Sequence, residues 1–268
     1  MRGVWRNHWL QSRRLVQMTG RSQNSRHRSQ QGARLMSHPP HSILVVGASR
    51  GLGHAIAAEF LKKDWKVMGT VRGTARTLLH DLADAHPGRV EIESLDITDP
   101  GQIQALRERL ADRRFDILFV NAGTTNPDPT QTIGEVSTED FVNLMVANAL
   151  SPMRVVESLA GNVPPDGLIG VMSSGQGSIA DNETGQREVY RGSKAALNQL
   201  LRSFAARQAG TPRALLAMAP GWVRTELGGP EGRLTIKQSV PSLVEVMLAK
   251  RGRPGLEYLD YRGRTVAW

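Results

Sequence analysis

The most constraining feature of this chain is a short apolar run that leads directly into a glycine-rich turn. Residues 43–46 are all branched aliphatic, and Gly47-Ala-Ser-Arg-Gly51-Leu-Gly53 follows without a break. Residues 52–63 then carry apolar side chains at helical spacing. A buried strand, a tight turn and a helix in this order are typical of the first unit of a doubly wound α/β fold.

The same alternation continues along the rest of the chain. Further strands are predicted at 66–71, 90–95, 116–120, 168–172 and 214–218 and just before Trp268, and further helices at 75–85, 102–111, 139–159, 189–208 and 239–250. Strands joined by helices of this length imply parallel crossovers and a sheet covered on both faces. We therefore predict one α/β domain over residues 41–268, a Rossmann-type doubly wound parallel sheet with helices on both faces.

The net charge of +9 is concentrated in the first 40 residues, which hold eight Arg and no acidic residue. Subtracting these from the 34 Lys and Arg leaves 26 basic residues against 25 acidic ones. We therefore expect no nucleic acid or membrane partner for the domain. The arm is predicted to be mostly disordered. Three explanations of the arm stay open. It is a mitochondrial- or plastid-type transit peptide, or a binder of nucleic acid or membrane surfaces. The third is an extension that the native protein lacks, since Met36 lies just before the first strand.

The chain has no cysteine, which excludes disulfides and fits a reducing compartment. No apolar run approaches the roughly 20 residues that span a bilayer. We expect a cytoplasmic protein, or a mitochondrial or plastid one if the arm is a transit peptide.

The glycine turn is predicted to bind the pyrophosphate of a dinucleotide. Gly47 makes the turn out of the strand, Gly51 lets the backbone approach phosphate, and Gly53 allows the helix to pack closely. The second strand ends in Gly69-Thr-Val-Arg72, with no acid to accept from a ribose 2′-hydroxyl. Arg50 and Arg72 are placed to surround a 2′-phosphate instead, which favours NADP(H). The alternative is that both are solvated loop charges.

The pattern G-x-x-x-G-x-G resembles the cofactor loop of the short-chain dehydrogenases/reductases, with Val46 where that family usually has Thr. Over residues 42–268 the chain is most similar to the Sniffer-like and C-factor-like carbonyl reductases. The resemblance implies cofactor contacts from Ser49 and Leu52 in the loop, Asp96 and Ile97 at the adenine, Asn121, Ala122 and Gly123 after the fourth strand, and Pro220, Gly221, Val223 and Thr225 at the nicotinamide. Trp222 lines the pocket or packs under its loop.

Catalysis is predicted to centre on Tyr190 and Lys194, which lie four residues apart and so share one face of a helix. Tyr190 is the expected general acid/base, with its pKa lowered by the ammonium of Lys194 and by an oxidised nicotinamide. The resemblance adds Ser174, with Ser173 as its rival, as the group that binds the substrate oxygen. It also adds Asn148 as the holder of a water that links Lys194 to solvent.

The interval from Ser174 to Tyr190 is longer than is common in that family, and the excess is expected to reshape the pocket rim within 181–189. The predicted function is NADPH-dependent reduction of a small carbonyl substrate, or oxidation of the alcohol. The alternative is a C-factor-like signalling or scaffold protein that senses the cofactor. The predicted site needs no metal, and both a monomer and a homo-oligomer stay open.

Overall fold

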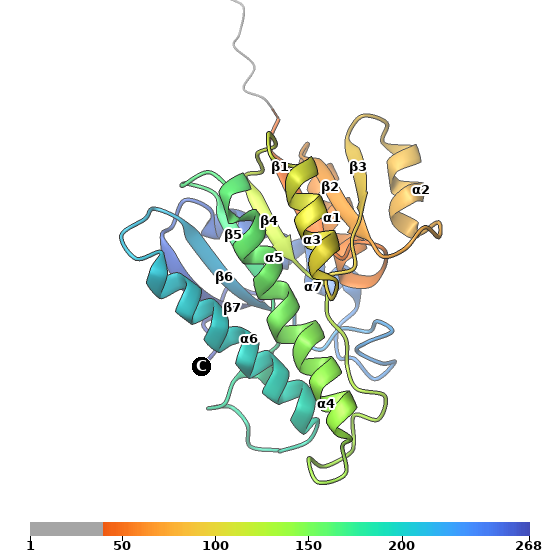
Figure 1. Cartoon of the computed structure of the whole chain (residues 1–268), viewed down its shortest axis with the longest axis vertical. Helices are drawn as coiled ribbons and strands as arrows, with labels where there is room; N and C mark the ends of the chain where they lie inside the picture. Colours follow the sequence, from red (N-terminus) through yellow and green to blue (C-terminus); the bar gives the residue numbers. More distant parts are fainter. Residues whose placement is uncertain (1–39) are drawn as a thin grey trace, which may run out of the picture. The chain divides into compact units, whose positions relative to one another are not determined.

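Apolar strands and amphipathic helices alternate as the sequence predicts in the computed structural model, which describes residues 40–268 (Figure 1). The predicted N-terminal arm lies outside the described residues, except for Pro40. The strands are β1 (Ser42–Val46), β2 (Lys66–Val71), β3 (Val90–Ser94), β4 (Ile117–Val120), β5 (Leu168–Met172), β6 (Ala214–Ala219) and β7 (Gly255–Asp260). The α-helices are α1 (Gly51–Lys62), α2 (Leu78–Ala85), α3 (Pro100–Arg109), α4 (Thr138–Met145), α5 (Ser151–Leu159), α6 (Glu188–Arg207) and α7 (Ile236–Lys250).

The seven strands of residues 40–268 form one parallel sheet with the order β3-β2-β1-β4-β5-β6-β7. Leu44 in β1 lies opposite Met68 on one side and opposite Leu118 on the other. The strand order therefore reverses between β1 and β4. A doubly wound sheet opens a crevice at this position, outside the carboxyl ends of its strands.

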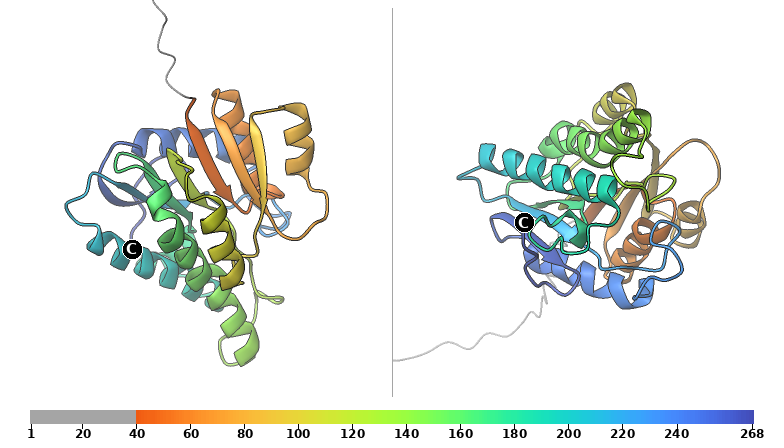
Figure 2. Two further views of the ribbon diagram at one scale, coloured as in Figure 1. Left: turned by 45° about the horizontal axis from the view of Figure 1, so that its top comes forward. Right: turned by 90° about the horizontal axis from the view of Figure 1, so that it is seen from below.

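Both faces of the sheet are buried because successive side chains of a strand point to opposite sides. Leu44 and Val46 belong to a core shared with α3, α5 and α6, whereas Ile43 and Val45 belong to a second core with α1, α2 and α7. In Figure 1, α3, α5 and α6 lie in front of the sheet, and Figure 2 shows the two layers from other sides. The predicted fold class is confirmed.

The long helix predicted at 139–159 differs in one respect from a regular α-helix. Its middle, Val146–Leu150, is a π-helical segment between α4 and α5. Such an extra residue within a helix is often found at a functional site. It lies here around Asn148, whose side chain is fully buried. A single wide turn hardly disturbs the 3.6-residue spacing of the apolar side chains, so this spacing could not predict it.

Helix α7 begins three residues before its predicted start. Thr235 and Gln238 form a capping box, in which each side chain bonds the backbone N–H of the other.

None of the helices within residues 40–268 is long and apolar enough to cross a membrane.

Candidate active site

A cleft of about 1410 Å³ opens at the carboxyl ends of the strands. It runs from the glycine turn between β1 and α1 to Ser174, Tyr190 and Lys194. Single ligand pockets usually measure about 300–1,000 Å³, so this cleft has room for a dinucleotide and a small second molecule. The predicted residues on its wall are Gly47, Ser49, Arg50, Gly51, Leu52, Arg72, Asp96, Ile97, Asn121, Ala122, Gly123, Ser174, Tyr190, Lys194, Pro220, Gly221, Val223 and Thr225. The other two predicted residues, Gly53 and Asn148, are buried and do not line the cleft.

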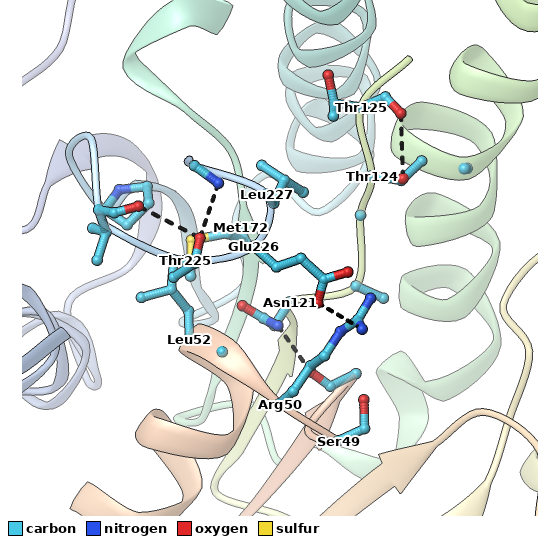
Figure 3. A pocket seen from close by; sticks show the side chains of 18 of the residues that line it. Ser49, Arg50, Leu52, Asn121, Thr124, Thr125, Met172, Thr225, Glu226 and Leu227 are labelled. Atoms are coloured by element: carbon cyan, nitrogen blue, oxygen red, sulfur yellow. Dashed lines mark hydrogen bonds and ion pairs between the residues drawn. The ribbon is translucent and has the colours of Figure 1, made fainter. Parts of the chain in front are cut away.

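The glycine turn packs tightly against the end of β4. Gly47 has a φ of +85°, and a Cβ there would lie 2.9 Å from Ala122. A Cβ on Gly53 would lie 2.0 Å from the carbonyl oxygen of Gly47. That carbonyl accepts a hydrogen bond of 2.8 Å from Nδ2 of Asn121 (Figure 3). The turn is thus held from both sides at the start of α1, and its shape fits a pyrophosphate at a helix N-terminus.

Thr70 in β2 also supports the turn, and the sequence reading had missed it. Its side-chain oxygen accepts a hydrogen bond of 2.9 Å from the backbone N–H of Gly47. The residue before the first glycine is Val46, which has no hydroxyl to offer. The buried threonine on the neighbouring strand therefore supplies a hydrogen bond at this turn.

Three arginines line the end of the cleft predicted for the 2′-phosphate. Arg50 forms an ion pair of 2.7 Å with Glu226, which reaches across from the loop after Thr225 (Figure 3). Arg76 bonds Asp81 and Asp84 in α2. Arg72 is exposed and, within residues 40–268, has no ion pair. Within residues 40–268, Arg72 is thus the one of these three arginines without a carboxylate partner, whereas Arg50 is paired with Glu226.

The other segments predicted to contact the cofactor are turns closed by hydrogen bonds. Asp96 accepts hydrogen bonds from the backbone and side chain of Thr98, at 2.9 and 2.7 Å, which closes the turn after β3. After β6, the carbonyl of Pro220 accepts 2.7 Å from Ser239 in α7, and Thr225 accepts 3.0 Å from the N–H of Gly228. Trp222 is 45% exposed and lines the cleft, and its Nε1 donates 2.7 Å to the carbonyl of Gly228 in the loop.

Tyr190 and Lys194 lie on the inward face of α6 and are both buried. The Lys194 Nζ lies 5.9 Å from the centre of the Tyr190 ring and donates a hydrogen bond of 2.9 Å to the carbonyl of Met172. Burial lowers the pKa of Lys194 to about 8. Burial also raises the pKa of Tyr190, although a hydrogen bond with Ser174 and the charge of Arg187 act in the opposite direction. The expected lowering of the Tyr190 pKa is not found, because desolvation outweighs the opposing effects of Ser174 and Arg187.

The two adjacent serines after β5 have different partners. Ser173 is buried and donates 2.6 Å to Oδ1 of Asn198 in α6. Ser174 accepts from the N–H of Gln176 at 3.1 Å, and its hydroxyl is near enough to Tyr190 to act on the pKa of that phenol. The Tyr258 hydroxyl in β7 donates to the main-chain carbonyl of Ser174. Ser174 is thus the serine beside the phenol, and Ser173 holds the strand end to α6.

Asn148 joins the turn after β4 to α6. Its Oδ1 accepts 2.8 Å from the N–H of Thr124, and its Nδ2 donates to the Thr124 carbonyl at 2.8 Å and to Ser193 at 3.0 Å. Both amide hydrogens are therefore used within the protein. A Cβ on Gly123 would lie 3.2 Å from Oδ1 of Asn148 and 3.3 Å from Nζ of Lys194, so a side chain there would crowd both groups.

Arg187 is a cleft residue that sequence reasoning did not single out. It is the N-cap of α6 and has left-handed backbone angles (φ 62°, ψ 42°). Its guanidinium carbon lies 5.1 Å from the centre of the Tyr190 ring, and Nη2 donates 3.3 Å to the hydroxyl of Thr125. The only sequence signal was the extra length of 181–189.

Comparison with known proteins agrees with this geometry. The short chain dehydrogenase family model matches residues 41–233, so the chain belongs to that family, as the resemblance predicted. A short-chain dehydrogenase/reductase from Burkholderia multivorans, crystallised with bound NADP, is 74% identical over 86% of this chain and all of that chain, with a TM-score of 0.85.

Two further proteins are more distant. A carbonyl reductase from Pseudomonas aeruginosa PAO1 in complex with NADP is 33% identical over 86% of this chain and all of that one, with a TM-score of 0.79. The protein named C-signal from Myxococcus xanthus is 31% identical over 155 residues, which are 57% of this chain and 92% of that protein.

Proposed function

We propose that this protein is an NADPH-dependent carbonyl reductase. The observation that carries the proposal is the meeting of Ser174, Tyr190 and Lys194 in the cleft that begins at the glycine turn. A phenol, a hydroxyl and an ammonium together can bind a carbonyl oxygen and give it a proton. The NADP bound to the Burkholderia and Pseudomonas proteins supports the choice of cofactor, as does Arg72 at the end of β2.

Each side chain has a separate task. Bound NADPH supplies the hydride, and its ring gains a positive charge on oxidation, which favours the phenolate. Ser174 donates a hydrogen bond to the substrate oxygen, and Tyr190 gives that oxygen its proton as the carbonyl carbon accepts the hydride. Lys194 holds the ribose and stabilises the phenolate until a solvent proton replaces the one transferred. Overall the C=O bond becomes CH–OH, and one hydride and one proton are consumed.

The raised pKa of Tyr190 keeps the phenol in the protonated form that reduction of a carbonyl requires. A buried phenol keeps its proton at neutral pH, and the protonated form is the one that donates. Asn148 acts by holding Thr124 against α6. The water relay from Lys194 to solvent stays a prediction, since both amide hydrogens of Asn148 bond other groups of the protein.

The test is to replace Tyr190 by Phe and to follow NADPH oxidation with a panel of aldehydes and ketones. Turnover should fall by about 10²–10⁴-fold, the usual contribution of a general acid, while NADPH binding changes little. Tyr261→Phe is the matched control, because Tyr261 packs behind Gly221 and does not line the cleft. Undiminished turnover by Tyr190→Phe would refute the assignment.

The likeness to C-signal supports a second candidate, a signalling or scaffold protein that binds the cofactor without turnover. The same panel separates the two. A sensor binds NADPH tightly but oxidises it with none of the compounds, whereas a reductase turns over at least one. The complete set of Asn148, Ser174, Tyr190 and Lys194 favours the enzyme.

We further propose a small carbonyl or alcohol as the partner of residues 41–268, a cytoplasmic location, and either a monomer or a homo-oligomer in solution. A transit-peptide role for the arm would change the location to the mitochondrion or plastid. Size-exclusion chromatography with light scattering measures the oligomeric state directly.

A further inference from the structure

The substrate end of the cleft carries a cation without an acidic partner. Arg187 lines the cleft, and its one hydrogen bond to another side chain within residues 40–268 is the 3.3 Å contact with Thr125. A guanidinium has five N–H donors, so most of its capacity is unused there. Its Nε is buried and has no hydrogen-bond partner in the described part of the chain. Arg187 is therefore not held by the ion pairs that hold other arginines of this protein.

The carboxylates of the cleft lie elsewhere. Asp81 is paired with Arg76, Glu226 with Arg50, and Asp96 bonds Thr98, and these are the acidic residues on the wall. The carboxylate next to Arg187, that of Glu188, accepts 2.8 Å from the N–H of Ile133 instead.

The position of Arg187 separates it from the phosphates of a bound dinucleotide. Its partner Thr125 lies on the opposite side of the pocket from Ser49 and Arg50 (Figure 3). The guanidinium itself packs on the ring of Tyr190. Positive charge at this end of a partly buried cleft attracts anions to the phenol.

We propose that Arg187 selects substrates that carry a carboxylate one or two carbons from the reacting carbonyl, that is, keto acids. This inference rests on the proposed reductase function and deepens it. A carboxylate matches the planar fork of a guanidinium and can accept two parallel hydrogen bonds from it. Because the guanidinium lies against the ring of the proton donor, only a carboxylate close to the carbonyl reaches both groups. Arg187 also has a left-handed backbone, which is unusual for a residue other than glycine and is found more often at functional sites.

The test compares acid and ester forms of the same ketone, because they differ in charge but little in shape. The probes are pyruvate with methyl pyruvate and phenylglyoxylate with methyl phenylglyoxylate, each reduced with NADPH. The wild-type enzyme should show a higher kcat/KM for the acid in at least one pair. Arg187→Gln should lower the acid-to-ester ratio of kcat/KM by at least about tenfold, and Arg187→Lys should lose less, because it keeps the charge without the fork.

Arg191→Gln is the matched control. Arg191 lies one turn further along α6, is half-buried, and bonds Gln186 and Thr184 outside the cleft. The Arg191→Gln substitution removes the same charge and should leave the acid-to-ester ratio of kcat/KM unchanged. An equal fall in the ratio for Arg191→Gln would attribute the effect to general electrostatics and overturn the proposal.

Other results overturn the inference in distinguishable ways. If Arg187→Gln lowers acid and ester reduction equally and shifts the pH profile, Arg187 acts through Tyr190 and not on the substrate. If neutral carbonyl compounds are reduced but neither acid is preferred, keto-acid selection is wrong and the reductase function stands. If NADPH binds and no carbonyl compound oxidises it, the proposed function fails and the inference fails with it.

Discussion

The buried ammonium of Lys194 should make the active protein less stable than an inactive variant. Burial lowers the pKa of Lys194 from 10.5 to about 8. One pKa unit is worth about 1.4 kcal/mol, so the charged form costs the folded chain roughly 3 kcal/mol at pH 7. Lys194→Met removes that cost together with the hydrogen bond to Met172, which is worth about 1 kcal/mol. The variant should therefore be more stable by about 2 kcal/mol at pH 7, and inactive.

The stability difference between Lys194→Met and the wild type should depend on pH. Between pH 8 and 10.5 the unfolded chain holds a proton on Lys194 that the folded chain has lost, so the stability of the wild type rises with pH in this window. The Met variant lacks that contribution. Its advantage should shrink above pH 8 and fall to about zero near pH 10, because the neutral amine of the wild type still donates to Met172.

Urea unfolding of the cofactor-free protein at pH 7, 8, 9 and 10 measures the difference, in which contributions from other titrating groups cancel. Lys62→Met is the control, since the Lys62 side chain is 70% exposed and stays in water on folding. A difference between Lys194→Met and wild type that stays constant from pH 7 to pH 10 would refute the reasoning. So would a wild type that is the more stable protein at pH 7.

Two further substitutions test the cofactor end of the cleft. Gly53→Ala places a methyl group 2.0 Å from the Gly47 carbonyl, so NADPH affinity measured by fluorescence titration should fall at least about tenfold and stability by about 1–3 kcal/mol. Gly192→Ala, with no atom within 4 Å of its new Cβ, should instead stabilise α6 by about 0.5–1 kcal/mol, and equal behaviour of the two variants would contradict this. Glu226→Gln frees Arg50 for the 2′-phosphate and should tighten NADPH binding about two- to fivefold, with NADH binding unchanged, since exposed ion pairs are worth about 0.2–1 kcal/mol. Weaker NADPH binding by this variant would show that Glu226 helps to hold the cofactor.

Local periodicity was enough to predict the fold. Strand β2 and strand β5 have the predicted bounds, and most other elements begin and end within three residues of their predicted positions. Apolar runs of this length and helical stripes are properties of neighbouring residues, so they can be read without knowing what they pack against. The right-handed parallel crossovers that follow from them then allow few sheet orders.

Short motifs likewise predicted most of the cleft wall, because strand ends of a doubly wound sheet meet at one edge. The glycine turn, the segment after β4 and the turn after β6 lie there together. Spacing alone placed Tyr190 and Lys194 on one face of α6. The sequence did not predict the contacts of Thr70, Glu226 and Arg187. None of these residues belongs to a recognisable motif, and the contact of each depends on how the folded chain brings its partner close.

Charge and protonation depend on contacts between distant segments. The pKa of Tyr190 and of Lys194 follows from how many other elements exclude water around α6, and no spacing rule measures that. The choice between Ser173 and Ser174 was decided by Asn198, a residue 25 positions later in the chain. From the residues alone came the class of fold and the place of the reaction. The environment of each reacting group was decided by the packing of α6 against β5, because desolvation and hydrogen-bond partners exist only once the chain is folded.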